Sequence, residues 1–271
     1  MSRQIIGDYH LHSSFSGDSD APLEDMIRKG ADLGLTVMCI TEHMDEDFPE
    51  GAGIDFSLDI ESYYNKLMAL REKYKPLLDL RFGIELGLQP HLADFHSRFV
   101  RKYPFDFIIG SSHVADGIDP YYPEFYEGRT EDEAYRSYFE SILENLDAFS
   151  DIDVYGHIDY VVRYGPNKNR YYSYGKFRDV IDAILLKVID KGIGIECNTG
   201  GIKYGLGHPN PCEEILTRYR ELGGEILTIG SDAHAPKHVA YAFGQLPELL
   251  KSCGFTHYTI FRGRKPEFLP L

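Results

Sequence analysis

The stretch DYHLH, residues 8–12, stands near the start of the chain and follows the apolar pair Ile5-Ile6 after a single glycine. The apolar pair predicts a short buried strand, and side chains two positions apart on a strand point to the same face. His10 and His12 would therefore leave the strand end side by side, as two imidazoles must in order to share one metal ion. Two histidines on a polar strand edge would look the same, so the interpretation depends on ligands from other segments.

Apolar, β-branched runs alternate with amphipathic helical patterns along nearly all of the 271 residues. The candidate strands are Arg3–Tyr9, Thr36–Thr41, Asp79–Leu86, Phe105–Ser111, Ile152–Gly156, Gly192–Glu196, Glu225–Ile229 and His257–Phe261. The candidate helices are Leu23–Leu33, Ile60–Tyr74, Gln89–Lys102, Glu131–Ser150, Phe177–Lys191, Pro211–Leu222 and His238–Cys253. Such alternation implies parallel strands in a barrel or an open α/β sheet. No linker or repeat interrupts it, so we expect one domain over residues 1–271.

Potential metal ligands stand at or just past the ends of almost all the candidate strands. In a barrel of strands and helices these ends converge on one face, where such folds place their active sites. Six of the eleven histidines fall at strand ends, whereas chance placement would scatter them among helices and loops. The set therefore favours a functional site, composed of His10, His12, Glu42, His43, Glu85, His113, His157, Asn198, Asp232 and His234. The other five, His91, His96, His208, His238 and His257, are expected to be surface or packing residues, with His208 the foremost candidate for an exception because its Gly-rich loop could border the site.

The formal net charge of −15 limits the classes of partner. Nucleic-acid binding needs clustered Lys and Arg, which the chain lacks, so we expect no nucleic-acid partner. No run of 18 or more apolar residues exists, so we expect no transmembrane helix and no membrane partner. The field of an acidic protein repels an anionic substrate, but a cluster of divalent cations would reverse the charge locally.

The cysteines and the N-terminal residues indicate the cellular compartment in which the protein is expected. Cys39, Cys197, Cys212 and Cys253 are scattered without a CxxC pair, and three of them stand in apolar settings. They are interpreted as reduced core residues. The first residues lack the apolar region of a signal peptide. Together these features predict a cytoplasmic protein, and they leave its oligomeric state open.

The candidate ligands exceed the needs of a single ion. The six strand-end histidines with Glu85, Asp232 and Asp18 make nine, which is three apiece for three ions. His and carboxylate ligands serve Zn, Mn and Fe(II) alike. Three divalent ions and three carboxylates leave a positive pocket, which suits a phosphate monoester. Adjacent ions also lower the pKa of a bridging water and stabilise the charge that develops on phosphoryl oxygens.

Motifs of competing mechanisms are absent from the sequence. There is no GxSxG nucleophile elbow, no Walker A loop and no HExxH motif. The nearest match to a dinucleotide fingerprint, Gly205-Leu206-Gly207, lacks the third glycine. Asp151-Ile152-Asp153 is similar to the start of an aspartyl-phosphate motif, but Tyr155 stands where that motif has a small hydroxyl residue or Val. A metal-dependent mechanism remains the one that the residues favour.

Seven ordered motifs resemble those of the polymerase-and-histidinol-phosphatase (PHP) superfamily of metal-dependent phosphoesterases. They are DYHLHSSFSGD (8–18), TEH (41–43), GIELG (83–87), SSH (111–113), GHIDYVVRY (156–164), IECNTGG (195–201) and GSDAH (230–234). The resemblance covers essentially the full length. The chain length and the motifs GHIDYVVRY and IECNTGG are most similar to the monofunctional histidinol-phosphate phosphatases. The resemblance implies an α/β fold, a distorted (β/α)7 TIM-like barrel in a single domain, holding three metal ions.

The resemblance also implies which residues bind each ion. The first ion would be held by His10, His12, Glu85 and Asp232, and Glu85 would bridge to a second ion that His113 and His157 complete. The third would take Asp18, His43 and His234. Asp18 departs from the family pattern, because many members have histidine there. A loop carboxylate making an Asx turn is the alternative role for Asp18.

The expected reaction is direct hydrolysis by a hydroxide between the first two ions, without a phosphoenzyme. The departing oxygen needs a proton or a metal, which the third ion or its ligands His43, His234 and Asp18 would supply. Arg163 is the candidate for binding the phosphate, because a guanidinium fork matches phosphate oxygens. Asn198 is expected to bind substrate or to orient a ligand, and Phe15 to stack on a substrate ring. A loop salt bridge for Arg163 and core packing for Phe15 are the alternatives.

Three functions remain open at this point. The first is hydrolysis of L-histidinol phosphate to L-histidinol and phosphate in histidine biosynthesis. The second is hydrolysis of another phosphate ester, such as a nucleotide, an oligonucleotide or phosphotyrosine. The third, from a different class, is a metal-binding or ligand-binding barrel without catalysis, which decayed ligand positions would favour. All nine positions carry residues able to bind a metal.

Overall fold

The strands of the chain form a parallel sheet that curves into a barrel. The computed structural model describes residues 4–49, 53 and 55–271. Seven strands pair in parallel, in the order in which they occur along the chain. They are β1 (Gly7–Asp8), β2 (Val37–Met44), β3 (Asp79–Gly87), β4 (Phe107–Ser111), β5 (Val154–Tyr155), β6 (Gly194–Asn198) and β7 (Leu227–Gly230). The predicted α/β barrel is confirmed, and Arg3 of the first predicted strand lies outside the described residues.

Backbone hydrogen bonds bring the two ends of this sheet together. Tyr9 N donates to Ile229 O at 3.0 Å, which joins the end of β1 to β7. Just beyond the strands, Asp232 N donates to His10 O, and His12 N donates to the carbonyl of Ala233, both at 2.9 Å. The sheet is therefore a nearly closed barrel, and its closing seam runs through the DYHLH stretch.

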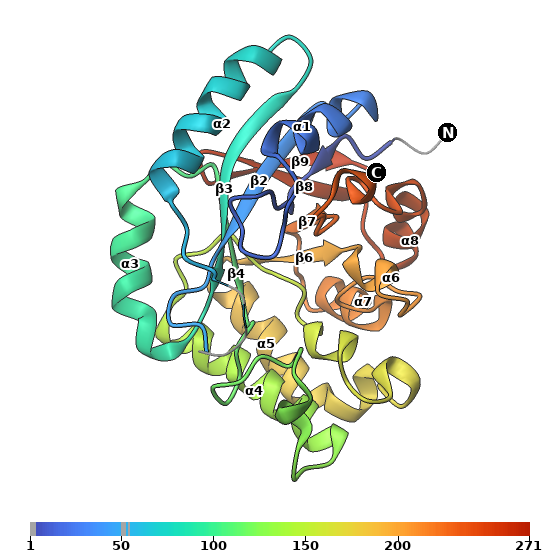
Figure 1. Ribbon diagram of the computed structural model, residues 1–271. Helices are drawn as coiled ribbons and strands as arrows, with labels where there is room; N and C mark the ends of the chain where they lie inside the picture. The colour runs from blue at the N-terminus through green and yellow to red at the C-terminus, as the bar shows by residue number, and fades with distance from the viewer. Residues whose placement is uncertain (1–3, 50–52, 54) are drawn as a thin grey trace.

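The helices lie outside the strands, as Figure 1 shows. Their bounds are α1 (Leu23–Asp32), α2 (Ile60–Tyr74), α3 (Ala93–Lys102), α4 (Glu131–Ala148), α5 (Arg178–Asp190), α6 (Gly200–Lys203), α7 (Glu213–Glu221) and α8 (Leu246–Ser252). Sequence periodicity explains why they cover the barrel: the apolar stripe of α5, including Val180, Ile184 and Val188, is buried. A capping box of Thr130 and Glu133 begins α4.

Several predicted strands and helices are shorter than expected, such as β1, β5 and α3, and two predicted elements differ more strongly from the observed ones. The helix predicted over His238–Cys253 is shorter, since α8 begins only at Leu246 after irregular backbone and short 3-10 turns. The strand predicted over His257–Phe261 exists as β8 (His257–Arg262), but it does not enter the barrel. It pairs antiparallel with β9 (Lys265–Pro270) in a separate two-stranded sheet. The periodicity of a strand does not specify its partner, so this pairing could not be predicted.

The β8–β9 hairpin covers the N-terminal ends of the barrel strands. The hydroxyl of Tyr9, inside the barrel, donates to Phe261 O at 2.8 Å. The hairpin turn donates from Gly263 N to Asp106, the residue before β4, at 3.0 Å. Arg264 Nε donates to Asp153, the residue before β5, at 3.1 Å. With this end closed, the opposite end of the barrel is the one that remains open for a ligand.

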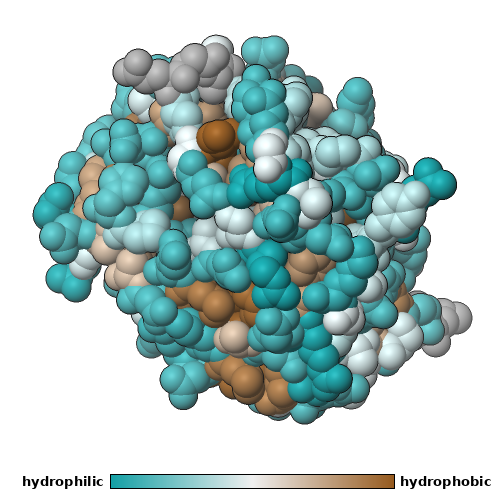
Figure 2. All heavy atoms as spheres, turned by 90° about the horizontal axis from the view of Figure 1, so that it is seen from below, coloured by the Kyte–Doolittle hydropathy of each residue, from teal (hydrophilic) through white to brown (hydrophobic). Residues whose placement is uncertain are grey.

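The surface is mainly polar, as the share of charged residues in the sequence leads one to expect. Figure 2 shows a face that is mainly hydrophilic, with apolar patches between the polar side chains. Within residues 4–49, 53 and 55–271, no helix is long and apolar enough to cross a membrane. All four cysteines are buried and free.

Candidate metal and phosphate site

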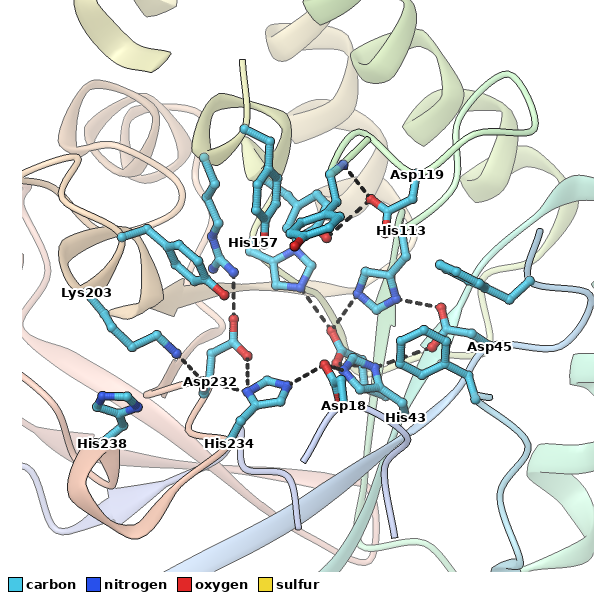
Figure 3. A pocket seen from close by; sticks show the side chains of 18 of the residues that line it. Asp18, His43, Asp45, His113, Asp119, His157, Lys203, Asp232, His234 and His238 are labelled. Atoms are coloured by element: carbon cyan, nitrogen blue, oxygen red, sulfur yellow. Dashed lines mark hydrogen bonds and ion pairs between the residues drawn. The ribbon is translucent and has the colours of Figure 1, made fainter. Parts of the chain in front are cut away.

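A cavity of about 580 Å³ opens at the C-terminal ends of the barrel strands. Its lining comes from several strand ends and the loops that follow them, and it includes Asp18, His43, Glu85, His113, His157, Arg163, Asp232 and His234. Because adjacent parallel strands run in one direction, residues far apart in the sequence meet here. The structure brings all nine predicted ligands together in one cluster. Figure 3 shows those that line the cavity, among them Asp18, His43, His113, His157, Asp232 and His234.

Glu85, near the end of β3, lies at the centre of the cluster. Its Oε2 lies 3.0 Å from His10 Nε2, and its Oε1 lies 2.9 Å from His157 Nε2 and 3.3 Å from His113 Nε2. The side chain is fully buried. Burial alone would raise the pKa of Glu85, but the imidazoles around it hold the pKa well below its usual range. Glu85 is therefore an ionised carboxylate whose two oxygens face different histidines.

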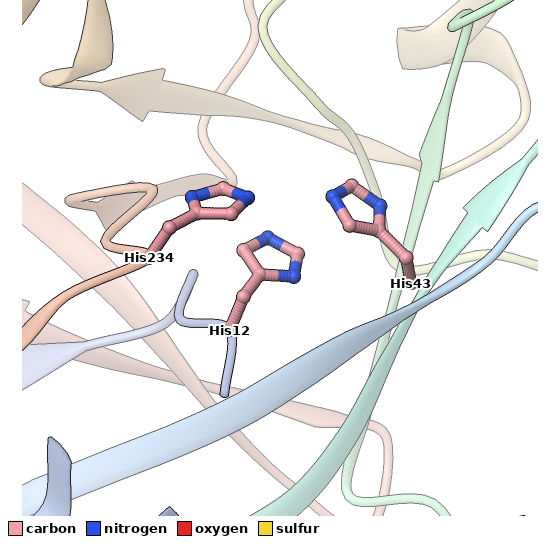
Figure 4. A group of neighbouring side chains, drawn as sticks. All are labelled: His12, His43 and His234. Carbon is pink, nitrogen blue, oxygen red and sulfur yellow. The ribbon is translucent and has the colours of Figure 1, made fainter. Parts of the chain in front are cut away.

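A second part of the cluster consists of three imidazoles and one carboxylate. The rings of His12 and His43 are stacked with centroids 4.0 Å apart, and those of His12 and His234 lie 4.3 Å apart. Figure 4 shows these three rings converging from three separate segments. Asp18 Oδ2 lies 3.0 Å from His234 Nε2 and 3.6 Å from His43 Nε2. Asp18 thus faces the cluster, as the predicted ligand role requires.

The donor set fits divalent cations. Four overlapping groups of three side chains each place their ligand atoms within 4.8 Å of one another: His12–His43–His234, His10–His157–Asp232, His10–His12–Glu85 and His43–Glu85–His113. The buried His12 Nε2 has no hydrogen-bond partner among the described residues. Burial, followed by the charges of His43 and His234, holds the pKa of His12 well below its usual value, which favours the neutral form that binds metals.

Two further carboxylates, neither of which was a predicted ligand, contact the clustered imidazoles. Asp45 Oδ1 lies 2.6 Å from His113 Nδ1, and Glu196 Oε1 lies 2.6 Å from His10 Nδ1. Each contact engages the ring nitrogen opposite the one that faces Glu85. Carboxylates in this position fix the tautomer and the ring orientation of a metal-binding histidine. The sequence carried a signal for Glu196, because a charged residue inside the buried run Gly194–Asn198 needs a polar partner.

Arg163 is buried at the cavity wall and is fixed by three contacts within the protein. Its Nε donates to Asn210 at 2.7 Å, its Nη1 to Asp232 Oδ2 at 2.7 Å, and its Nη2 to Asn198 at 2.9 Å. A guanidinium has five N–H donors, so two remain after these contacts. Arg163 thus combines the predicted salt bridge with the capacity to bind an anion.

Asn198 and Phe15 occupy different surroundings. Asn198 is fully buried beneath the cavity, where its Oδ1 accepts from Arg163 and from Gly200 N at 2.8 Å. This position suits the orienting role that was one of its two expected functions. Phe15 is partly buried against the core, and its ring lies 5.7 Å from that of Tyr63. Its surroundings suit the packing alternative.

Glu42 and His238 lie in surroundings other than those that the sequence predicts for them. Glu42 lies outside the cluster and accepts hydrogen bonds from the backbone and hydroxyl of Ser13 and from Ser16, so it anchors the DYHLH loop. His238, expected to be a surface or packing residue, lines the cavity. Lys203 also lines it and donates to Asp232 O at 2.8 Å. Their loops fold back over the barrel end, which no local sequence pattern indicates.

The geometry defines the class of protein. The cluster of imidazoles and carboxylates suits divalent ions, and a fixed arginine lies beside it. Metal-dependent phosphoesterases use such groups to bind and activate a phosphate ester. The family model described as PHP domain matches residues 8–200. The chain therefore belongs to the PHP domain family.

Particular members of this family are similar over nearly their whole length. The chain is 31% identical to a histidinol-phosphatase from Lactococcus lactis over 263 residues, which cover 95% of each chain. It is 32% identical to a probable histidinol-phosphatase from Clostridium acetobutylicum over 252 residues, 92% of this chain and 94% of that one. A crystal structure of the histidinol phosphate phosphatase from Lactococcus lactis, complexed with zinc, L-histidinol and phosphate, superposes with a TM-score of 0.87. The superposition covers 96% of this chain and 98% of that chain.

Proposed function

We propose that this protein is a metal-dependent phosphomonoesterase that hydrolyses L-histidinol phosphate to L-histidinol and phosphate. The observation that carries the proposal is the convergence of nine potential ligands, with Glu85 at their centre, beside the fixed guanidinium of Arg163. The relatives named as histidinol-phosphatases support the choice of substrate. The reaction would serve histidine synthesis in the cytoplasm, on a small molecule, with neither nucleic acid nor membrane as partner.

The proposed cofactors are three divalent ions, either Zn, Mn or Fe. The overlap of four ligand groups in one cluster supports more than one ion, and zinc in the related crystal structure supports its use here. The proposed ligand sets are His10, His12, Glu85 and Asp232 for the first ion, Glu85, His113 and His157 for the second, and Asp18, His43 and His234 for the third. Divalent ions bound in this cluster would lower the pKa of a water and offset the charge of the phosphoryl oxygens.

The chain's own residues bind and orient the ester. Arg163 presents its two remaining N–H donors to the phosphate, while Asp232, Asn198 and Asn210 prevent the guanidinium from turning away. An alkoxide is a poor leaving group, so the departing oxygen needs a proton. His43, His234 and Asp18 are the proposed donors, because they line the cavity and contact one another.

A panel of phosphate esters tests this proposal. Purified protein supplied with Zn, Mn or Fe(II) is incubated with histidinol phosphate, nucleotides and phosphotyrosine, and phosphate release is measured. We expect kcat/KM to be highest for histidinol phosphate. A higher kcat/KM for a nucleotide or for phosphotyrosine would mean that the protein is a phosphoesterase with a different substrate. Bound metal without turnover of any ester would make the barrel a non-catalytic binding protein and overturn the proposal.

A further inference from the structure

The same cavity contains a carboxylate, Asp119, that belongs to none of the ligand groups. It lies in the connection between β4 and α4, just after the bridge that pairs Ala115 with Ile118. Its side chain lines the cavity although the residue is only 9% exposed. Figure 3 places Asp119 beside His113 and away from Lys203, which stands on the other side of the cluster. Asp119 is therefore a buried acid at the wall of a substrate-sized cavity.

The hydrogen bonds of Asp119 use only one of its two oxygens. Oδ1 accepts from Tyr121 N at 2.8 Å and lies 3.5 Å from the hydroxyl of Tyr160. Within the described parts of the chain, Oδ2 accepts no hydrogen bond, and no Lys, Arg or His forms an ion pair with Asp119. Burial raises the pKa of Asp119 to about 6. A buried carboxylate without an ion-pair partner is costly, and a bound cation would lower that cost.

Tyrosines lie beside this carboxylate, since the Tyr121 backbone and the Tyr160 hydroxyl both contact it. Tyr121, Tyr160 and Tyr164 all line the cavity, and their ring centroids lie 5.3 Å apart between Tyr121 and Tyr164 and 5.0 Å apart between Tyr160 and Tyr164. Ring faces attract cations and offer flat surfaces to a planar heterocycle. A carboxylate among tyrosine rings thus suits an organic cation better than a hydrated inorganic one.

The cavity is consequently divided by charge. The cations that suit a phosphate, Arg163 and Lys203, both contact Asp232. Asp119 and its tyrosines lie on the side of His113 and His157, since the Tyr160 ring is 5.7 Å from His113 and 5.0 Å from His157. A ligand in the cavity would meet Arg163 and Lys203 on the side of Asp232. On the side of His113 it would meet a carboxylate beside tyrosine rings, of which that of Tyr160 also lies 5.4 Å from the Arg163 guanidinium.

We propose that Asp119 binds the positively charged end of the substrate, its ammonium or imidazolium group, and so selects phosphate monoesters that carry a cation. This inference rests on the proposed function and adds to it a residue that determines specificity. The phosphate alone is common to all the esters in the cell, so a second contact at the far end is what distinguishes one of them.

The test compares wild-type protein with Asp119→Asn on two matched esters. Histidinol phosphate carries the cation, whereas 3-phenylpropyl phosphate has a similar shape and no charge on its tail. Loss of one charge-assisted hydrogen bond predicts a KM for histidinol phosphate that is about 10- to 100-fold higher, with kcat much less affected. The KM and kcat of the variant for 3-phenylpropyl phosphate should stay within about twofold of the wild-type values. This ester has no cation to bind Asp119, so the substitution removes no contact with it. An equal loss on both esters would mean a structural role and would overturn the inference.

Asp116→Asn provides the matched control. Asp116 lies three residues earlier, on the exposed side of the same loop, where it binds Arg129 and Ser137. Its φ of 54° lies in the left-handed region, which Asn tolerates. We expect Asp116→Asn to leave the KM for histidinol phosphate unchanged. An increase as large as that of Asp119→Asn would assign the effect to the loop and contradict the inference.

Wild-type protein supplies a test that needs no variant. One analogue of histidinol phosphate keeps the ammonium and lacks the imidazole (2-aminopropyl phosphate), and another keeps the imidazole and lacks the ammonium (3-(imidazol-4-yl)propyl phosphate). The group that Asp119 binds is the one whose presence lowers KM relative to 3-phenylpropyl phosphate. If neither analogue has a lower KM, while histidinol phosphate is still hydrolysed, this inference alone fails. If wild-type protein hydrolyses other esters but not histidinol phosphate, the proposed function fails and the inference with it.

Discussion

The two ends of the barrel both bury acidic side chains, but they differ in what those side chains bind. At the N-terminal end, the carboxylates bind fixed donors of the protein: Asp106 accepts from Phe82 N and Gly263 N at 3.0 Å each. At the C-terminal end, the buried Glu85 faces imidazoles that converge on it, and the more exposed Asp18 faces His234. Backbone amides and Arg264 satisfy the acids of the first end, whereas the acids of the second end contact imidazoles that are proposed metal ligands.

This difference distinguishes a polar cluster that serves the fold from one that serves a function. The hairpin β8–β9 completes the N-terminal end, where Asp153 accepts from Ile108 N at 2.8 Å and from Arg264. At the C-terminal end, His12 Nε2 and His43 Nδ1 remain without hydrogen bonds in the part of the chain that the structure describes. At the N-terminal end, Arg81 Nε and Nη1 are also unpaired, but guanidinium nitrogens cannot bind a metal ion, whereas ring nitrogens can. The two ends should therefore respond differently to substitution.

The largest effect is expected for Glu85→Gln at the C-terminal end. The amide removes the charge that faces several histidines, and metal-dependent stabilisation of several kcal/mol should be lost with it. This predicts a fall in kcat of at least about 1000-fold. Phosphate release, measured with metal content determined on the same sample, checks the prediction. Near-normal turnover by a Glu85→Gln protein would contradict the proposed ligand sets.

A smaller effect at the same end is expected for Glu196→Gln. Glu196 contacts His10 Nδ1 and accepts from His157 N at 3.1 Å, so it acts on two proposed ligands without facing the substrate. Loss of such a carboxylate predicts metal affinity that is lower by about 10- to 100-fold. Competition with a chelator of known affinity measures this directly, and excess metal should restore most of the activity. Unchanged metal affinity would remove the orienting role from Glu196.

The smallest effect on activity is expected for Arg264→Ala at the N-terminal end. Arg264 contacts Asp153 and Asp151, at 3.1 Å and 2.7 Å, so its loss leaves a buried carboxylate with one partner fewer. The free energy of unfolding should fall by about 1–3 kcal/mol. Urea unfolding measures this change, and kcat/KM of the folded protein should equal that of the wild type. A loss of turnover without a loss of stability would mean that the two ends are coupled.

The sequence predicted the C-terminal end better than the N-terminal end, for physical reasons. Strand ends are local features, and parallel strands bring them to one face, so residues such as His10, Glu85 and His157 could be assigned from position alone. The pairing of β8 with β9, rather than with the barrel, depends on contacts over long sequence distances that periodicity does not contain. The family resemblance then supplied the division of the ligands among three ions, which spacing alone does not give.

The remaining site residues required the folded chain. Asp45 stands two positions after His43, on the same face of the strand end, so alternation could have found it. Asp119 lies in an irregular connection, where no period relates a residue to the barrel axis. The surroundings of Arg163 come from three separate segments, those of Asn198, Asn210 and Asp232, and only their meeting shows that two N–H donors remain.

The most direct test of metal dependence is to measure hydrolysis of histidinol phosphate by one preparation before and after metal removal. Protein stripped with a chelator and then freed of it should release no phosphate above the blank, and Zn, Mn or Fe(II) should restore turnover in proportion to the metal bound. Circular dichroism of the stripped sample checks that the barrel remains folded. Full turnover by protein without measurable metal would contradict the assignment of the C-terminal end as a metal-dependent phosphoesterase site.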